Sequence, residues 1–431
     1  MSSTFDVVVI GGRPAGASLA ARLAASNLSV LVVDKAHFPA PPEVPSCPIM
    51  YSTAVELFDE IGFVEAKYAH AATKIRQGIV AFEGYFAATL RVPETFGRDY
   101  FYGFNRELFD AALWDHLRTI PNVTCRDGFT VTGVTRADDG RVVGIVGGDH
   151  EQVTARLGVI GADGRHSFLA RKLDARVVED RGDHTSTIHF AEWEGVSPAT
   201  ADGEAVLHII STGRGENVLF FPSAAGRISI AVQIRTDRAD INGDPDAYYA
   251  RHLQALPTVR ARIANARQVG PLLGVRRIAN RYRDVGGPGW ALVGDAVHHK
   301  DPLDGQGIRD ALVEARALAG LIVEVRDGRI TWSELLVRYR DAVHEATHPM
   351  FEQTMKRLAR DLYTDLKPAV IRTLVRWSLT DPEYQRRFLL FVGRAIAPDD
   401  FRTPALLAGV IARGIARDVQ GVVARGLGRA A

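Results

Sequence analysis

The chain of 431 residues has only two cysteines, Cys47 and Cys125, which excludes a framework of stabilising disulfides. Two distant cysteines also lack the spacing of a zinc site, so we expect no metal. Neither charge sign is in excess, because 52 basic and 51 acidic residues leave a net charge of +1. That balance argues against a nucleic-acid partner. No apolar run reaches the length of about 20 residues that a membrane-spanning helix needs.

Two further absences concern processing and catalysis. The first residues lack the basic flank of a signal peptide, so together with the scarce cysteines we expect a cytoplasmic protein. We find no convincing Ser/His/Asp triad. What is present is an ordinary globular composition, 46% hydrophobic and 24% charged, on a chain long enough for two or three domains.

A glycine-rich turn follows the first apolar segment. Residues 5–10 are predicted to form a buried parallel strand, residues 18–27 a helix and residues 29–34 a second buried strand. The glycine turn, residues 11–16, would then lie at the helix N-terminus, where free N–H groups and the helix dipole favour a pyrophosphate. The length and order of these parts are typical of a dinucleotide-binding βαβ unit.

Individual residues of this unit have separate expected tasks. Gly11 allows the tight turn, Ala15 lies within it, and Gly16 permits close contact between helix and strand. Asp34 ends the second strand and can accept the hydroxyls of a ribose. Arg13 replaces the middle glycine of the usual motif, so its side chain either turns away or pairs with a phosphate oxygen.

Two later segments repeat the pattern of a strand followed by a polar turn. Residues 157–161 lead into Asp163-Gly164, and residues 290–293 lead into Gly294-Asp295. A loop with Pro302, Gly305, Gln306 and Gly307 follows, and then apolar residues at helical spacing between Ile308 and Ile322. Each turn supplies a different part of one ligand site, so together they predict bound FAD.

On these motifs, residues 1–330 resemble the group A flavoprotein monooxygenases, the p-hydroxybenzoate hydroxylase-like family. The resemblance implies that Gly11 and Gly16 hold the FAD pyrophosphate and that Gly294 and Asp295 bind the ribitol chain. It implies that Asp163 contacts both FAD and the nicotinamide nucleotide. The family arginine that touches the FAD phosphates matches Arg106, on a helix with Asn105 as its expected N-cap.

The resemblance also places the loop from Pro302 to Gly307 under the flavin ring. The N-terminus of the following helix can stabilise negative charge on the flavin. Two positions depart from the family pattern: the usual asparagine is Arg309 and the usual aspartate is Glu314. The proline-rich loop at residues 39–48 is expected beside the pocket, with Cys47 and Tyr51 nearby.

We predict an α/β fold, α+β overall. A Rossmann-type FAD-binding domain takes residues 1–175 and 286–330, and an antiparallel β-sheet substrate domain is inserted at residues 176–285. The strand candidates of this insert are residues 187–193, 204–211, 216–222 and 227–235.

Residues 331–431 are expected to form a helical, arginine-rich C-terminal region. An apolar stripe there is made by Leu407, Val410, Ile411, Ile415, Val419, Val422 and Val423, with Arg413, Arg417, Arg425 and Arg429 outside it. We favour packing of this stripe on its own domain or on a second subunit, in a monomer or homodimer. A helix lying on a membrane surface is the alternative.

The resemblance implies a single-component FAD-dependent monooxygenase. NAD(P)H reduces the flavin, oxygen adds at C4a, and the hydroperoxide hydroxylates an aromatic or polycyclic small molecule, plausibly in natural-product tailoring. The alternatives are an FAD-dependent prenyl or alkene reductase like the geranylgeranyl reductases, a flavin-dependent halogenase, and a non-catalytic FAD-binding protein. The halogenase ranks low because the W-x-W-x-I-P signature is missing.

The candidate catalytic residues lie in the loop after the ribitol turn. His298 and His299 are the first candidates for a base that deprotonates a phenolic substrate. The resemblance places the backbone of Pro302 at the substrate's border, which is a positional role. Lys300 and Asp301 are expected to pair with each other.

Overall fold

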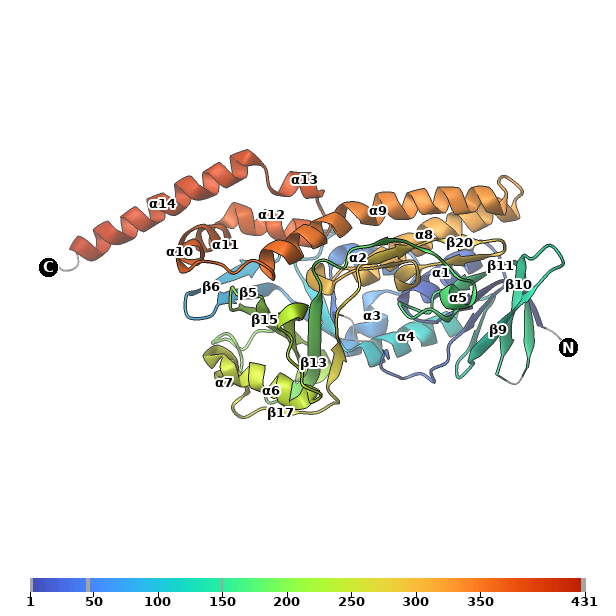
Figure 1. Cartoon of the computed structure of the whole chain (residues 1–431), viewed down its shortest axis with the longest axis horizontal. Helices are drawn as coiled ribbons and strands as arrows, with labels where there is room; N and C mark the ends of the chain where they lie inside the picture. Colours follow the sequence, from blue (N-terminus) through green and yellow to red (C-terminus); the bar gives the residue numbers. More distant parts are fainter. Residues whose placement is uncertain (1–2, 44–46, 149, 428–431) are drawn as a thin grey trace.

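The carboxyl ends of five parallel strands meet at one edge of the first sheet. In the computed structural model (Figure 1), which describes residues 3–43, 47–148 and 150–427, the sheet has the order β20-β21-β11-β1-β2-β8. Ile10 of β1 pairs with Gly161 of β11 and Val33 of β2, and Gly161 also pairs with Leu292 of β21. The three polar turns therefore begin side by side.

The predicted βαβ unit is confirmed as β1 (Ser3–Ile10), α1 (Pro14–Ala25) and β2 (Val30–Val33). The other members of the sheet are β8 (Val123–Arg126), β9 (Val131–Arg136), β10 (Val142–Gly147), β11 (Gln152–Gly161), β20 (Gly286–Gly287) and β21 (Trp290–Leu292). Helix α1 packs against α4 (Arg106–Arg118) and α8 (Gly307–Arg326). Strands β2 and β21 and the C-terminal halves of β1 and β11 are buried on both faces, as their unbroken apolar sequences predict.

One face of a second eight-stranded sheet packs against helices, and its other face lines a cavity. Its strands are β5 (Gln77–Phe82), β6 (Phe86–Arg91), β13 (Ser186–Glu194), β14 (Val206–Ser211), β15 (Glu216–Pro222), β16 (Ile228–Arg235), β17 (Arg267–Gln268) and β18 (Leu273–Val275). The four strands expected in the insert are β13 to β16. In β15, Val218 and Phe220 pack under α6 (Pro245–Ala255) and α7 (Pro257–Ile263), while Leu219 and Phe221 face the cavity.

The pairing in this sheet departs from expectation in two respects. Strands β5 and β6 belong to it, although our division of the chain placed residues 77–91 in the FAD-binding domain. The sheet is also not wholly antiparallel, because β14 pairs in parallel with β5. Periodicity shows which strands are half-buried but not which distant strand each one joins. The remaining domain boundaries stay a prediction.

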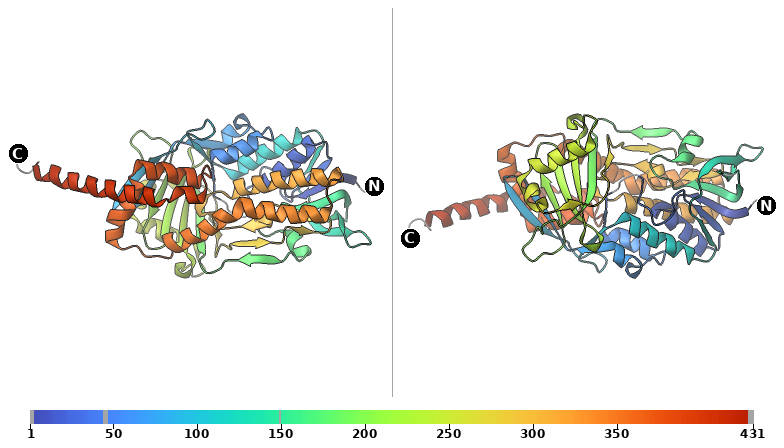
Figure 2. Two further views of the ribbon diagram at one scale, coloured as in Figure 1. Left: turned by 90° about the horizontal axis from the view of Figure 1, so that it is seen from above. Right: turned by 90° about the horizontal axis from the view of Figure 1, so that it is seen from below.

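The C-terminal region is helical, as predicted. It contains α9 (Trp332–Asp361), α10 (Pro368–Val370), η6 (Ile371–Val375), α11 (Arg376–Leu379), α12 (Pro382–Val392), α13 (Pro398–Phe401) and α14 (Pro404–Leu427). Helices α8 and α9 run side by side, and α14 projects beyond the rest of the chain (Figure 2). Among the described residues, no helix combines the length and the apolar character needed to cross a bilayer.

The expected packing of the C-terminal apolar stripe on its own domain is largely wrong, whereas packing on a second subunit stays a prediction. Val410 is buried at 3% exposure, but Leu407, Ile411, Ile415, Val419 and Val423 are exposed. The buried face of α14 rests on α11 and α12 instead. The side chains of Val422, Arg425 and Arg429 lie outside the described residues.

The remaining elements are small. Two three-stranded sheets comprise β3 (Ile49–Met50), β4 (Ala72–Ile75) and β7 (Phe101–Phe104), and β12 (Val177–Asp180), β19 (Arg281–Arg283) and β22 (His298–His299). The short helices are α2 (Ser52–Asp59), α3 (Glu65–Tyr68), η1 (Ala69–Ala71), α5 (Phe168–Lys172), η2 (Ala224–Gly226), η3 (Thr236–Arg238), η4 (Gly294–Ala296) and η5 (Pro302–Asp304).

Candidate active site

One cavity of about 1230 Å³ joins the three polar turns to the second sheet. Of the predicted site residues, those lining it are Gly11, Arg13, Ala15, Asp34, Arg106, Asp163, Gly294, Asp295, His298, His299, Pro302, Gly305 and Gly307. Gly16 and Gln306 are buried behind the lining. Segments far apart in sequence thus form a single site, while the role of each residue in it stays a prediction.

The glycine turn at the start of α1 leaves no space for side chains. Gly11 has φ of +104°, and a Cβ there would lie 2.4 Å from the carbonyl oxygen of Ala162. A Cβ on Gly16 would lie 1.9 Å from the carbonyl oxygen of Gly11. The first turn of α1 has no side-chain cap and no acidic residue. Its N–H groups therefore remain available to an anion at the positive end of the helix.

Asp34 ties this turn to the following loop. Its Oδ2 accepts a hydrogen bond of 2.8 Å from the amide of Gly12, and its Oδ1 accepts one of 2.9 Å from the amide of Ala36. A carboxylate oxygen has two lone pairs, so these bonds leave capacity for ribose hydroxyls.

Arg13 has protein partners rather than a free guanidinium. It forms an ion pair with the fully buried Asp110 and donates hydrogen bonds to the backbone carbonyls of Ala40 and Pro41. Asp110 also accepts from Arg106, at 2.9 Å. These contacts support the interpretation that Arg13 turns away from the phosphates, and its pairing with a phosphate oxygen stays untested. Asp110 was missed, although its position four residues after Arg106 is a readable helical spacing.

The two Asp-containing turns present different environments. Asp163 Oδ2 accepts from the amides of Phe168 and Leu169 at the start of α5, at 2.7 and 3.2 Å. Burial raises the pKa of Asp163, and its Oδ1 has no hydrogen-bond partner. Asp295 is instead exposed. Both carboxylates line the cavity and can accept hydrogen bonds from ligand groups.

The residues present fit FAD. Buried oxygen and nitrogen atoms without partners lie around the cavity, among them Asp163 Oδ1, Glu314 Oε1, Asp310 Oδ1 and His298 Nε2. An unpaired buried polar atom is costly, so such a group of atoms indicates a polar ligand. The uncapped N-terminus of α1 suits a diphosphate, and the turns at Asp163 and Asp295 suit polyol hydroxyls.

The loop expected under the flavin is held by buried charges and by the C-terminal region. Lys300 donates to Asp304 at 2.8 Å and lies 3.4 Å from Asp310, so the expected pairing with Asp301 is wrong. Arg394, from the segment after α12, reaches both of these carboxylates, at 3.0 and 3.3 Å.

Two further hydrogen bonds hold the segment at the end of α12, one from the flavin loop and one from α2. Gln306 donates to the carbonyl of Val392 at 2.6 Å, and Thr53 donates to that of Gly393 at 2.7 Å. Gln306 therefore holds the loop in place rather than facing the cavity.

His298 and His299 are both buried, and burial lowers the pKa of each. The pKa of His298 falls to about 3, with Tyr282 stacked on its ring at 4.4 Å and Glu314 Oε1 at 3.4 Å from its Nδ1. The pKa of Glu314 rises because burial and Asp310 disfavour its charge. His298 is therefore neutral near pH 7, and a histidine with so low a pKa is a poor base.

Asp301 is a site residue that sequence reasoning did not select. Its Oδ2 accepts from Ser186 at 2.5 Å, and its Oδ1 accepts from Gln233 at 3.1 Å. Burial raises its pKa to about 6, against the opposing effect of these hydrogen bonds. Gln233 lies on the cavity face of β16. The contact joins the loop before η5 to strands β13 and β16, which are distant in sequence, so sequence spacing gave no signal for it.

Comparison with known proteins agrees with this geometry. The profile of the family described as FAD binding domain matches residues 4–354. The chain belongs to this family. Ubiquinone hydroxylase UbiL of Rhodospirillum rubrum is 27% identical, and the aligned region covers 85% of this chain and 83% of the hydroxylase. Digeranylgeranylglycerophospholipid reductase 2 of Methanopyrus kandleri is 26% identical over 82% of this chain and 85% of its own.

The fold of this FAD-binding protein is also that of a solved flavoenzyme. The flavin-dependent brominase Bmp2 superposes with a TM-score of 0.77, covers 96% of this chain and all of its own, and is 20% identical. The resemblance to group A flavoprotein monooxygenases is confirmed, and the protein is an FAD-dependent oxidoreductase. Its relatives catalyse different reactions, so the reaction itself must be argued from the site.

Replacing Asp295 with alanine should release FAD without unfolding the protein. The exposed carboxylate faces the cavity, and a hydrogen bond to a charged group contributes about 1.5–3 kcal/mol, so we expect FAD affinity to fall about 10- to 100-fold. Flavin fluorescence titration measures this. Asp138→Ala, also at an exposed position, is the control. Unchanged FAD affinity in Asp295→Ala would contradict the ribitol assignment.

Arg13→Gly should affect stability more than FAD binding. The guanidinium is held by Asp110 and two carbonyls, so its loss should lower the free energy of unfolding by about 1–3 kcal/mol. The FAD dissociation constant should change by less than about threefold, because no phosphate contact is lost. Urea unfolding and flavin titration give the two quantities. A tenfold loss of FAD affinity corresponds to roughly 1.4 kcal/mol. A loss larger than this, with a smaller change in stability, would instead assign Arg13 to a phosphate.

His298→Gln should change how stability depends on pH. The folded-state pKa of about 3 lies below the ordinary 6.5, so the stability that neutral His298 contributes is complete above pH 6.5 and is lost as pH falls toward 3. The unfolding free energy of wild type should therefore fall relative to the variant by about 1.4 kcal/mol per pH unit in this window. His37→Gln, at a side chain 82% exposed, should run parallel to wild type. A constant difference for His298→Gln would refute its buried neutral state.

Proposed function

We propose that this protein uses NAD(P)H and O₂ to hydroxylate an apolar, aromatic or polycyclic small molecule. The observation that supports this is the continuity of the cavity. It runs from the three polar turns along the apolar face of the second sheet, past Ile188, Leu207 and Leu219, to Leu379 and Phe388 of the C-terminal region. FAD accounts for the polar end, and the apolar remainder suits a substrate that is poorly soluble in water.

The bound flavin supplies the redox chemistry, and the protein orients the substrate and excludes water. Apolar side chains on both sides of the cavity perform the second task. The sheet contributes Phe190 and Phe221, and Cys47 and Tyr51 close the opposite side near the flavin loop. Burial raises the pKa of Cys47 to about 12 and that of Tyr51 further, so both stay protonated.

Asp301 is the strongest candidate for holding the substrate's proton. Its pKa of about 6 lies nearer to neutrality than the pKa of His298. Proton transfer is most effective when the pKa of the catalytic group is close to the working pH. Ser186 and Gln233 fix the orientation of the carboxylate. His299 stays a second candidate, and Pro302 keeps its proposed positional role beside the substrate.

NAD(P)H as electron donor is supported by charge near the Asp163 turn. Arg165 and Arg171 line the cavity there, and guanidinium groups bind diphosphates well. A cytoplasmic monomer or homodimer and a role in natural-product biosynthesis remain part of the proposal.

An alkene reductase is the second candidate. A prenyl chain would fill the apolar cavity as well as a polycycle would, and one relative reduces a digeranylgeranyl lipid by name. Halogenation ranks third: the brominase shares the fold, but the halogenase tryptophan signature is absent from the sequence.

One set of assays separates these reactions. Purified FAD-loaded protein is supplied with NADPH or NADH and three probes: 4-hexylphenol in air, geranylgeraniol under anaerobic conditions, and 4-hexylphenol in air with bromide. Hydroxylation requires probe-stimulated NAD(P)H oxidation, matching oxygen uptake and a hydroxylated product. Anaerobic saturation of geranylgeraniol, or a brominated product, would each replace the proposal.

A cavity variant tests the location of the substrate. Leu219→Trp fills part of the apolar face and should raise KM for 4-hexylphenol about tenfold or more, while FAD content stays unchanged. Val178→Trp adds the same bulk at an exposed site and should have no effect. Equal KM values for wild type and Leu219→Trp would place the substrate elsewhere.

A further inference from the structure

Helix α14 carries an exposed apolar surface that no described residue covers. We call it the α14 stripe: Leu407, Ile411, Ile415, Val419 and Val423, exposed between 39% and 56%. The adjoining face of the helix is occupied, since Gly414 rests on Trp377, and Asp418 accepts from Arg376 at 2.6 Å. In two views α14 extends away from the body, so its apolar side faces solvent (Figures 1 and 2).

The spacing of the α14 stripe determines its shape. Residues four apart are separated by about 400° around a helix, so each step advances the stripe by roughly 40°. Across five residues it becomes a band roughly 160° wide that winds around the helix. A narrow seam with a period of 3.5 residues would suit a partner helix, whereas a wide band suits an apolar medium.

The cavity opens where the α14 stripe begins. Leu407, the first residue of the stripe, lines the cavity and is 39% exposed. Leu374 of η6 also lines the cavity and is 47% exposed. These two side chains therefore border the cavity and the outer surface at once. An apolar molecule could pass between the cavity and whatever covers the stripe without crossing water.

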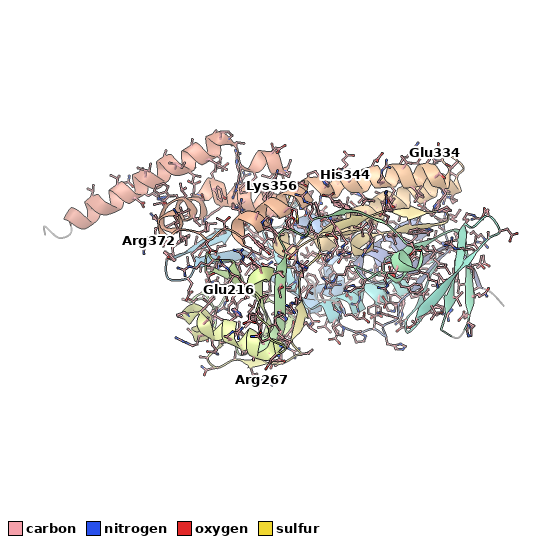
Figure 3. All side chains as sticks on the ribbon, viewed as in Figure 1. Glu216, Arg267, Glu334, His344, Lys356 and Arg372 are labelled. Atoms are coloured by element: carbon pink, nitrogen blue, oxygen red, sulfur yellow. The ribbon has the colours of Figure 1, made fainter. Side chains whose placement is uncertain are left out.

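The charge of this end of the molecule is unbalanced. Residues 366–431 contain eleven Lys or Arg and five Asp or Glu, whereas the whole chain has a net charge of only +1. The rest of the chain is therefore net negative. Exposed basic residues include Lys367, Arg372 and Arg386, and Arg372 projects outward beneath α14 (Figure 3). A strongly basic end with an apolar band is complementary to an anionic lipid surface.

We propose that α14 docks this protein on an anionic lipid bilayer, with the α14 stripe in the acyl boundary and the cavity mouth facing the membrane. A second copy fits less well, because it would bring two basic C-terminal regions together. The proposal concerns where the protein binds and holds for each of the reactions considered above.

Vesicle co-sedimentation of the full FAD-loaded chain tests this. Vesicles of phosphatidylcholine with one quarter phosphatidylglycerol should bind the protein, and binding should weaken at high salt. Ile415→Ser with Val419→Ser removes two apolar side chains from the α14 stripe and should weaken binding at least about tenfold. Ala416→Ser with Gln420→Ser changes exposed residues in the same turns and should stay within about twofold of wild type.

Helical circular dichroism and FAD content must match wild type in both variants, so that misfolding is separated from lost docking. Failure of wild type to bind anionic vesicles would overturn the proposal, as would equal binding by the stripe variant. Analytical ultracentrifugation tests whether a second copy of the chain covers the α14 stripe instead. A wild-type dimer that the stripe variant abolishes, without vesicle binding, would assign the α14 stripe to a second copy.

Discussion

The site depends on the parallel register of four strands. Ile10, Val33, Gly161 and Leu292 are the last residues of β1, β2, β11 and β21, and they lie in one row across the sheet. Because parallel strands point the same way, the segment after each one emerges at the same edge. Polar groups about 130 to 280 residues apart in sequence thereby surround one ligand, and the turns themselves need not touch one another.

This constraint explains why the polar half of the site was predictable. Each turn follows an apolar strand, so Gly11, Asp163 and Asp295 could be placed at strand ends from their own neighbours in sequence. The substrate half was less predictable. Strands β13 to β16 were recognised by alternation, but the parallel pairing of β14 with β5 joins residues more than 120 apart, and no local pattern encodes it. The contact of Asp301 with Gln233 depends on that same assembly.

The candidates for acid–base chemistry show a second limit of sequence reasoning. His298 was chosen because histidine ordinarily titrates near neutrality. Complete burial reverses that expectation, since its pKa falls to about 3, while burial of Asp301 raises a carboxyl to about 6. Residue type alone therefore did not indicate which of the two pKa values lies nearer to neutrality, because desolvation penalises the charged form of both groups and moves their pKa values in opposite directions.

The C-terminal region is part of the site rather than an appendage to it. Arg394 joins Lys300 in neutralising Asp304 and Asp310, and all four groups are buried. If the segment after α12 moved away, both carboxylates would lose a cationic partner in a low-dielectric setting, which is strongly unfavourable. The loop expected under the flavin and the segment that leads to α14 must therefore move together. A surface that binds α14 would consequently hold the whole catalytic cavity at a fixed orientation to that surface, with its Leu374 and Leu407 mouth nearest to it.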